Sequence, residues 1–462
     1  MSLLDASDPR PVHFVGIAGA GMSGLAELLV RRGVRVTGCD ASPTEESRRD
    51  LARIGVDAIP GHSADHVVGA RMLVVTSAMP KNHPELEAAR AASIPIVRRA
   101  EALGETTRVG DVIAIAGTHG KTTTTVLTTE ALAAARLDPT GLVGGRVSDW
   151  SGNLRLGSDR LFVVEADEYD RSFLALTPTI AVVTNVEADH LDIYRDLADI
   201  QSAFEQFIAP ARAVVLCADD DGADKLKVTS GAEVVRYGVD NNDARVVAEA
   251  VQLSPSGAVF ALYYDGKCLG DVDLQITGMH NVRNALAAIA SGLTLGVTLP
   301  AMLPGLQRFA GVERRFQRLG EARGVQVVDD YAHHPTEIRA TLAAARNAFP
   351  HSRLIAAFQP HLYTRTRDFA REFGEALATA DRVYLTEIYP AREQPIAGVT
   401  SALVKEAIER SGGTIAWFGE RASLADALAR GTDEGDVVLT LGAGDITKTG
   451  PELLERLRRG DA

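Results

Sequence analysis

The sequence predicts an α/β protein of three domains, each built around a mainly parallel β-sheet. The length of 462 residues suits two to four domains of ordinary size. Short apolar runs alternate with amphipathic, Ala-, Leu- and Arg-rich segments along the whole chain, which is typical of β–α–β units with parallel strands. The alternation pauses near residues 105–111 and 316–324. We therefore expect domains at residues 1–108, 109–317 and 318–462.

The composition excludes several classes of protein. Apolar residues make up 46% and charged residues 24%, which argues against long-range disorder. The net charge of −13 weighs against a protein that coats nucleic acid, because such binding needs clustered Lys and Arg. Cys39, Cys217 and Cys268 are too few and too far apart for a disulfide scaffold or a Cys-rich zinc site. The start of the chain lacks the pattern of a signal peptide, and no stretch is apolar enough to insert in a membrane, so we expect a cytoplasmic protein.

The first domain begins with buried strands expected at residues 12–17, 34–40 and 72–78. A G-x-G-x-x-G pattern at Gly19, Gly21 and Gly24 follows the first strand and opens a helix. Asp40 ends the next strand, 21 residues after Gly19, where an acid that binds a ribose would lie. This pattern needs only the close approach of a backbone to a diphosphate, so it fits a UDP-sugar, the NAD of an oxidoreductase, or a turn without a ligand.

The second domain begins with a strand at residues 112–117, and the segment GTHGKTT follows it. A strand, a Gly-rich loop and a helix in this order aim backbone N–H groups and the positive helix end at an anion. Lys121 can reach the outer phosphates of a nucleotide, and the Thr122 hydroxyl can hold Mg²⁺. The first glycine of a full P-loop is missing, because Ile115 stands in its place. The segment still predicts a nucleoside triphosphate site.

Further strands are expected at residues 161–167, 179–186 and 212–220. Acidic residues follow the first two, and the carboxyl ends of parallel strands are where open α/β sheets bind ligands. Glu165 is the best single candidate for a Mg²⁺ ligand, and His190 is a candidate for a second ion. Residues 246–276 have the alternating pattern of an antiparallel insert, with a turn at residues 264–267.

The third domain returns to β–α alternation, with strands expected at residues 325–331, 353–360, 382–389, 414–419 and 436–445. Just before it, Asn281 and Asn284 share a helix face. The adjacent His333 and His334 precede Pro335, so helix capping or substrate contact is favoured over a metal. Farther on, His361, Arg365 and Arg367 form a local cationic segment suited to a carboxylate or phosphate.

Taken together, the motifs resemble the Mur ligases of peptidoglycan synthesis. They are the Gly-rich start, GTHGKTT, VEADEYDRSF, TNVEADHLD, GMHNVRNALAA, ERRF, DDYAHHPTEI and FQPHLYTRTRDF, in this order along nearly the whole chain. The resemblance implies an N-terminal Rossmann-like domain for a UDP-sugar, a central P-loop-type ATPase and a C-terminal Rossmann-like domain for an amino acid. It also implies that L-alanine is joined to UDP-N-acetylmuramate through an acyl phosphate, with ATP and Mg²⁺, by a monomer or weak homodimer without nucleic acid.

The resemblance assigns roles to individual residues. The phosphates of ATP would contact Gly117, Thr118, His119, Gly120, Lys121, Thr122 and Thr123, and the rest of the nucleotide Asn281, Arg315 and Asp330. The metal ligands would be Thr122, Glu165 and His190, and the catalytic residues Lys121, Glu165, His190, His334 and Arg365. His334, His361 and Arg365 would place the alanine. The UDP-sugar would contact Gly19, Ala20, Gly21, Met22, Ser23 and Ser77, with Asp40 and His62 near the nucleoside.

Two departures from the family bear on the branch. Several Mur ligases have a carbamylated lysine where this chain has Phe204, and the branch that adds alanine also lacks it. Leu362 stands where some alanine-adding members have Arg, which leaves one charge fewer for the carboxylate of alanine. A recycling ligase that takes a preformed tripeptide is the close alternative. An NAD-dependent oxidoreductase and a nucleotide-gated binding protein are more distant ones.

Overall fold

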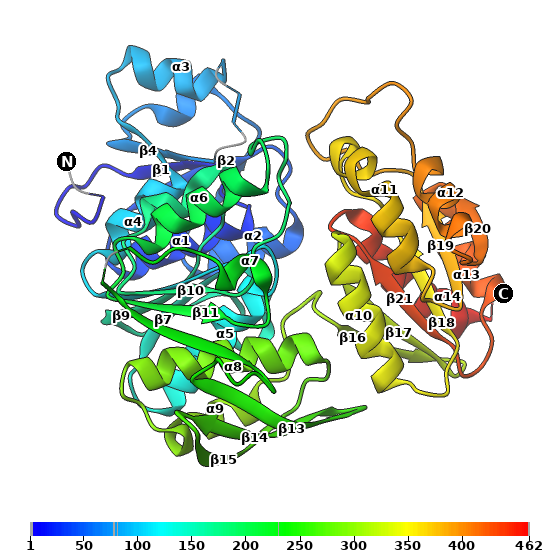
Figure 1. Ribbon diagram of the computed structural model, residues 1–462. Coiled ribbons are helices and arrows are strands. Elements are labelled where there is room, and N and C mark those ends of the chain that lie inside the picture. The colour runs from blue at the N-terminus through cyan, green and yellow to red at the C-terminus, as the bar shows by residue number, and fades with distance from the viewer. Residues whose placement is uncertain (1–2, 77–78, 81, 230, 461–462) are drawn as a thin grey trace.

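The computed structural model describes residues 3–76, 79–80, 82–229 and 231–460. Three sheets follow one another along the chain, and helices cover them, so the predicted α/β class is confirmed. The third sheet and its helices form a separate body beside the first two (Figure 1). None of the helices in the described part of the chain has the length and apolar character needed to span a bilayer.

The first sheet has the strand order β3-β2-β1-β4-β5, and all of its strand pairs are parallel. Its strands are β1 (Val12–Val15), β2 (Val36–Asp40), β3 (Ala58–Pro60), β4 (Met72–Val75) and β5 (Ile96–Arg98). Its helices are α1 (Ala20–Arg31), α2 (Glu45–Arg53), α3 (Pro84–Ala91) and α4 (Arg99–Thr107). We did not predict β3 and β5, because each is three residues long and partly exposed and shows no apolar run. The pause expected at residues 105–111 begins inside the last turn of α4.

The second sheet has ten strands in the order β15-β14-β13-β12-β11-β10-β6-β9-β7-β8. Its strands are β6 (Asp111–Ala116), β7 (Pro139–Val147), β8 (Gly152–Arg155), β9 (Ser158–Glu165), β10 (Ile180–Val183), β11 (Ala213–Cys217), β12 (Glu233–Val239), β13 (Val246–Ser254), β14 (Gly257–Tyr264) and β15 (Lys267–Leu274). Its helices are α5 (Lys121–Ala134), α6 (Leu197–Ile208), α7 (Asp221–Asp224), α8 (Met279–Thr294) and α9 (Leu299–Arg308). The predicted insert is confirmed, because β13, β14 and β15 pair antiparallel and the last two meet at residues 264–267.

The third sheet has the order β16-β17-β21-β18-β19-β20 and is parallel except for β16 at one edge. Its strands are β16 (Gln317–Ala322), β17 (Val325–Asp330), β18 (Leu354–Phe358), β19 (Arg382–Thr386), β20 (Ile415–Gly419) and β21 (Val437–Leu441). Its helices are α10 (Pro335–Ala348), α11 (Tyr363–Leu377), α12 (Ala402–Arg410), α13 (Leu424–Gly431) and α14 (Thr449–Arg459).

The connection into the third sheet lies earlier than the sequence predicted. We expected the pause between the second and third domains at residues 316–324, but strand β16 occupies most of that segment and belongs to the third sheet. The irregular link is residues 309–316. Gly311, Arg314 and Phe316 all have positive φ there, so the chain turns sharply before β16.

The hydrophobic cores divide the chain unequally. One continuous core joins residues of the first sheet, such as Phe14 and Leu25, to residues of the second, such as Val163 and Leu142. The third sheet has its own cores on its two faces. Polar and ionic contacts between the second and third sheets therefore have a large influence on how these two sheets are held together.

Candidate active site

The GTHGKTT segment forms the loop that the sequence predicted. Strand β6 ends at Ala116, and α5 begins at Lys121. Gly117 and Gly120 have φ of 140° and 81°, conformations that side chains rarely adopt. The end of β10 braces the loop, because Thr184 Oγ1 and Asn185 Nδ2 donate to the carbonyl of His119 at 2.6 and 3.1 Å. The N-terminus of α5 has no side-chain cap, so its N–H groups remain available to an anion.

Gly120→Ala is expected to abolish tight nucleotide binding. An added Cβ would lie 2.5 Å from Asn284 Oδ1, and the backbone would remain at positive φ. Gly412 is the matched control, because it has φ +80 and no atom within 4 Å of an added Cβ. Titration of a fluorescent ATP analogue should give a dissociation constant at least about 10-fold weaker for Gly120→Ala and unchanged for Gly412→Ala. Equal affinities of the two variants for the ATP analogue would contradict nucleotide binding at the loop that contains Gly120.

Lys121 is held in the loop by charge and by hydrogen bonds. Its Nζ donates to the carbonyls of Gly117 and Thr118 at 2.6 and 3.1 Å and lies 2.8 Å from Glu168 Oε2. Burial lowers the pKa of Lys121, but Glu168 outweighs it and raises that pKa. His190 Nε2 lies 3.4 Å from Glu168 Oε1, and although burial lowers the pKa of His190, the carboxylate raises it overall. The loop therefore keeps a permanently charged ammonium at the place where phosphates would bind.

Thr122 and Glu165 offer hard oxygen donors at the edge of the loop. Both border the Gly-Gly stretch of β7. A Cβ added to Gly144 would meet Glu165 Oε1 at 3.2 Å, and one added to Gly145 would meet the Thr122 methyl group at 3.2 Å. The Gly144 N–H donates to Glu165 Oε2 at 2.8 Å, which fixes the carboxylate while its other oxygen remains available. A hydroxyl and a carboxylate are the donors that Mg²⁺ prefers, so this pair fits that ion.

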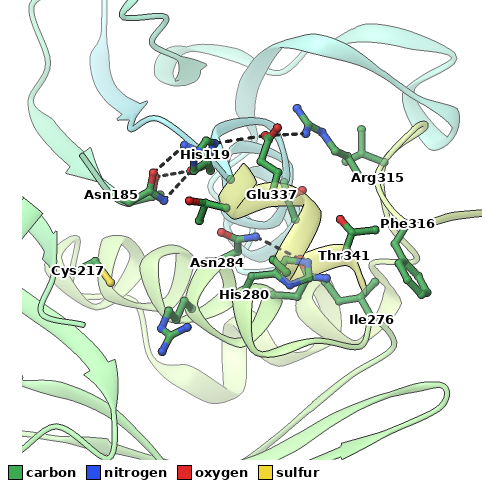
Figure 2. A pocket seen from close by; sticks show the side chains of 18 of the residues that line it. His119, Asn185, Cys217, Ile276, His280, Asn284, Arg315, Phe316, Glu337 and Thr341 are labelled. Atoms are coloured by element: carbon green, nitrogen blue, oxygen red, sulfur yellow. Dashed lines mark hydrogen bonds and ion pairs between the residues drawn. The ribbon is translucent and has the colours of Figure 1, made fainter. Parts of the chain in front are cut away.

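A cavity opens beside the loop. Its volume of about 320 Å³ is within the usual range of ligand pockets. It is bounded by the loop, by α8, by the link and by the start of α10 (Figure 2). Asn281, Arg315 and Asp330, predicted to contact the nucleotide, all line it. Asn284 Nδ2 donates to Asn281 Oδ1 at 3.2 Å, as expected for residues on one helix face. Burial raises the pKa of Asp330 to about 6, and its Oδ2 accepts from the Phe316 N–H at 2.7 Å.

Charged groups bridge the cleft between the second and third sheets. His119 lies 3.5 Å from Glu187 and 3.4 Å from Glu337 of α10. Burial lowers the pKa of His119, but the two carboxylates outweigh it and raise that pKa to about 9. Thr336 Oγ1 donates to Glu187 Oε2 at 2.6 Å, which adds a direct bond across the cleft. His334 caps α10 and accepts from the Thr336 N–H, so the predicted capping role is confirmed. His119, Glu187 and His334 each place one donor atom within 4.8 Å of the others.

This bridge predicts a loss of stability in alkali. The folded pKa of His119, about 9, exceeds the value of 6.5 for an exposed histidine. The contribution is therefore fully present below pH 6.5 and is lost as pH rises through about 9. It amounts to roughly 3 kcal/mol. Urea unfolding of the wild type and His119→Gln at pH 7 and pH 10 checks this. The difference in free energy of unfolding between the two proteins should be smaller at pH 10 than at pH 7 by most of that amount. An equal difference at the two pH values would contradict the assignment of this pKa to His119.

A buried ion pair makes a second bridge. Arg365 Nη2 of α11 donates to Asp189 Oδ1 at 2.7 Å, and both side chains are less than one-tenth exposed. His361 Nδ1 lies 3.4 Å from Arg365 Nη1, and burial lowers the pKa of His361 to about 3, so this imidazole is neutral. Arg367, on the same helix, instead pairs with Asp368 on the surface. Leu362, at the start of α11, has φ of 71°, a strained conformation for a side chain of this kind.

A second loop follows β1 and ends at Gly19, the N-cap of α1, while Gly21 and Gly24 lie in the first turns of that helix. The Ala18 N–H donates to Asp40 Oδ2 at 3.0 Å, and the Ser42 N–H donates to Asp40 Oδ1 at 3.1 Å, so Asp40 anchors the loop. Asn153 Nδ2 donates to the carbonyl of Ala20, and its distance from Ser23 Oγ is 3.4 Å. Met22 lies in the first turn of α1 and is buried in the core. His62 Nδ1 lies 3.3 Å from Cys39 Sγ. Ser77 lies outside the described residues.

Some residues of the cleft carry no clear signal in the sequence. Phe309 and Gly311 line the cavity from the link, which we had not expected to contribute. Arg283 pairs with Asp219 at 2.8 Å, and both residues line the cavity. The i, i+3 spacing from His280 could have indicated Arg283, but nothing in the sequence pairs Arg283 with an aspartate 64 residues away.

Comparisons with known proteins agree with this architecture. Three family models match the chain: "Mur ligase family, catalytic domain" at residues 11–109, "Mur ligase middle domain" at residues 115–292 and "Mur ligase, glutamate ligase domain" at residues 314–444. The chain is similar to the UDP-N-acetylmuramate–L-alanine ligase of Myxococcus xanthus, with 44% identity over 99% of this chain and 97% of that one. The ligase of the same name from Rubrobacter xylanophilus is 45% identical over 96% of this chain and 100% of its own length.

Solved structures give the same result. The crystal structure of UDP-N-acetylmuramate-alanine ligase from Thermotoga maritima matches with a TM-score of 0.84 and 30% identity, covering 98% of this chain and 100% of that chain. A murein peptide ligase from Psychrobacter arcticus matches with a TM-score of 0.74 and 26% identity, covering 97% of this chain and 99% of that one.

Proposed function

This chain belongs to the Mur ligase family, and we propose that it joins L-alanine to UDP-N-acetylmuramate in the synthesis of peptidoglycan precursors. The reaction consumes ATP and releases ADP and phosphate. The observation that carries the proposal is the match to L-alanine ligases at 44% and 45% identity over nearly the full length. The braced phosphate loop and the cleft that faces α10 and α11 support it.

The three parts of the chain have separate tasks in this proposal. Residues 1–108 bind the UDP-sugar, residues 109–317 bind ATP, and residues 318–462 bind the amino acid. The sheets at residues 12–98, 111–274 and 317–441 support this division. We further propose that the protein acts in the cytoplasm, where ATP is found, as a monomer or weak homodimer.

The chemistry requires the chain to position groups and to neutralise charge. A carboxylate is a poor electrophile, so its oxygen first attacks the γ-phosphate and forms an acyl phosphate, with ADP as the leaving group. The amine of alanine then attacks the carbonyl carbon, and phosphate leaves. Lys121 neutralises the charge that builds up on the transferred phosphate, and the N-terminus of α5 binds the adjacent oxygens. The remaining loop residues, from Gly117 to Thr123, hold the phosphates through their backbone.

The proposed amino-acid site is formed by α10 and α11. His334, His361 and Arg365 lie where these helices face the second sheet. Asp189 already pairs with Nε and Nη2 of Arg365, so Nη1 is the atom that would meet a carboxylate. Burial lowers the pKa of His334 to about 4, so its imidazole is neutral and would accept a hydrogen bond from alanine without repelling the ammonium charge. A closed cleft would exclude water, which would otherwise hydrolyse the acyl phosphate.

Mg²⁺ is the metal that this reaction implies. Thr122 and Glu165 would hold it, with His190 at the position of a second ion, and the bound ion would screen the negative charges of the phosphates. The hard oxygens of Thr122 and Glu165 support the assignment.

The UDP-sugar is proposed to lie against the Gly-rich loop after β1. The backbone at Gly19, Ala20, Gly21, Met22 and Ser23 would face the diphosphate, and Ser77, outside the described residues, is proposed as a further contact. Asp40 holds the loop, which supports a positioning role near the nucleoside. His62 remains a candidate for the base.

Phosphate release tests the proposed function. The protein is incubated with ATP, Mg²⁺, UDP-N-acetylmuramate and one amino compound at a time. We expect release with L-alanine, slower release with glycine or serine, and none without an amine, because a methyl group contributes only about 1–3 kcal/mol of selectivity. Release with the tripeptide alone would instead assign the recycling reaction. Tight binding of NADH without any release would revive the oxidoreductase.

A further inference from the structure

A buried group of thiol, imidazole and carboxylate side chains lies under the Gly-rich loop, and apart from His62 none of its members has a role in the proposed reaction. We call it the thiol–histidine cluster. It lies between the first sheet and α3. Its members are His13, Cys39, His62, His66, His83 and Glu85.

The fold brings these residues together from four elements. His13 lies on β1 and Cys39 on β2, and the register pairs His13 with Thr37 and Val15 with Cys39. Because side chains alternate along a strand, His13 and Cys39 point to the same face of the sheet. Glu85 lies in the first turn of α3, and His66 lies in the short helix η1 (Ala64–Val67) that packs beside it.

Three donor atoms, from Cys39, His62 and Glu85, have nearly the spacing of ligands around one ion, whereas His66 Nδ1 is at hydrogen-bond distance from Glu85. Cys39 Sγ lies 3.2 Å from Glu85 Oε2 and 3.3 Å from His62 Nδ1, and these last two atoms are 3.7 Å apart. A tetrahedral zinc ion with bonds of about 2.0–2.3 Å has ligands roughly 3.3–3.8 Å apart. On the other side, His66 Nδ1 lies 2.8 Å from Glu85 Oε1. His13, Cys39, His66 and Glu85 each place one donor atom within 4.8 Å of all the others.

Two imidazole nitrogens in the cluster, His13 Nε2 and His83 Nδ1, lack a hydrogen-bond partner among the described residues. His13 Nδ1 bonds Thr37 Oγ1 at 2.9 Å, while its Nε2 is buried and makes no hydrogen bond, and the residue is 0% exposed. A histidine whose one nitrogen is held by a neighbour and whose other nitrogen is free has the usual arrangement of a metal ligand. Leaving such a nitrogen unpaired in a core is otherwise costly.

The charges also suit a divalent ion. The Glu85 side chain is fully buried, and apolar residues such as Val67, Leu73 and Leu86 pack around Cys39 on the same side of the sheet. A thiolate and a carboxylate together balance two positive charges, so a bound divalent ion would leave no net charge in this core. Burial, with Glu85 beside it, raises the pKa of the Cys39 thiol, so the sulfur keeps its proton unless a metal replaces it.

We propose that the thiol–histidine cluster binds one zinc ion through Cys39, Glu85 and two of its imidazoles. Sulfur and imidazole donors select zinc over Mg²⁺, so this site is chemically distinct from the one at Thr122 and Glu165. On binding, the Sγ–H bond of Cys39 breaks, an Sγ–zinc bond forms, and the proton passes to solvent. The partly exposed His62 and His66 provide the way in.

The site would stiffen the loop above it. The carbonyl of Cys39 accepts the N–H groups of Gly16 and Ile17 at 2.8 and 3.0 Å. The next residue, Asp40, holds the Ala18 N–H. A zinc ion would therefore join β1, β2, η1 and α3 directly under the turn that begins the Gly-rich loop.

Cobalt titration of the chelator-treated full-length protein tests the proposal. We expect one equivalent of Co²⁺ to give the intense visible bands of a four-coordinate ion and a near-ultraviolet charge-transfer band from a thiolate. Zn²⁺ should remove both, and excess Mg²⁺ should remove neither. Cys39→Ser should lose the charge-transfer band, while Cys217→Ser, a change at another buried free cysteine, should keep it. An absent band, or one that persists in Cys39→Ser, would overturn the proposal.

Further variants separate ligands from neighbours. Thr37→Val removes the partner of His13 and should weaken Co²⁺ binding about 10–100-fold. The variants His13→Gln, His62→Gln and His66→Gln identify the two imidazoles, and unchanged affinity in all three would contradict the site. If Cys39→Ser does not fold, alkylation of the wild type gives the answer. Zn²⁺ should slow the modification of Cys39 at least 10-fold but not that of the exposed Cys268. Equal protection of the two cysteines, or none, would count against the proposal.

Discussion

Lys121→Ala is expected to lower kcat by about 10²–10³-fold while the protein stays folded. The Nζ atom lies between two loop carbonyls and Glu168, at the N-terminus of α5, so it is the fixed positive charge nearest to the proposed phosphate site. Removal of one preformed group of this kind from a dry site has an effect of that size. The loss should appear in kcat, because the charge is needed most when the phosphate is transferred.

Two controls make the result specific. Lys225→Ala removes an exposed lysine that pairs with Asp221 at one helical turn, and its activity should be unchanged. Thermal unfolding shows whether Glu168, left without Lys121, destabilises the variant. Because His190 also faces Glu168, we expect only a modest decrease in the melting temperature. A Lys121→Ala protein with full kcat would refute the role of this residue.

Arg365→Ala is expected to open the cleft and to lower kcat/KM for alanine by at least about 100-fold. The Arg365–Asp189 pair is buried and joins α11 to the end of the TNVEADHLD segment. Removal of one partner from such a pair costs about 3–5 kcal/mol, because the other charge is left buried. The third sheet has its own cores, so the loss should separate the bodies and leave each folded.

Small-angle scattering checks this directly. The radius of gyration of Arg365→Ala should exceed that of the wild type, whereas Arg367→Ala, two residues along the same helix on the surface, should scatter like the wild type. In a double-mutant cycle with Asp189→Asn, the effects should be strongly non-additive. Scattering curves that superimpose for all of these proteins would show that the pair does not hold the cleft closed.

Much of the fold could be predicted from the sequence, because its signals are local. Apolar runs bounded by turn residues located the buried strands, and the alternating pattern at residues 246–276 located the antiparallel insert. Strands β7, β8 and β12 were not predicted either, and β3 and β5 have three partly exposed residues each, too short for a periodic signal. The pause between domains was predicted too late in the chain, because β16 is an edge strand whose Gln317 and Arg318 resemble a linker.

The site was less accessible to prediction, because its contacts span long distances in sequence. The motifs named Lys121, Glu165 and Arg365, but no local pattern pairs Arg365 with Asp189, which lies 176 residues earlier. The bridge from His119 to Glu337 also depends on how two separate bodies meet. The thiol–histidine cluster was not predicted for the same reason. Cys39 is far in sequence from the other two cysteines, and the histidines of the cluster come from separate elements.

The fate of the carboxylate oxygen tests the central claim most directly. UDP-N-acetylmuramate labelled with ¹⁸O in both carboxylate oxygens is incubated with the protein, ATP, Mg²⁺ and L-alanine. The masses of the products are then measured by mass spectrometry. If the carboxylate attacks the γ-phosphate, the released phosphate carries one ¹⁸O and the new amide keeps the other. Phosphate without label, or label in AMP, would contradict a ligase that works through an acyl phosphate.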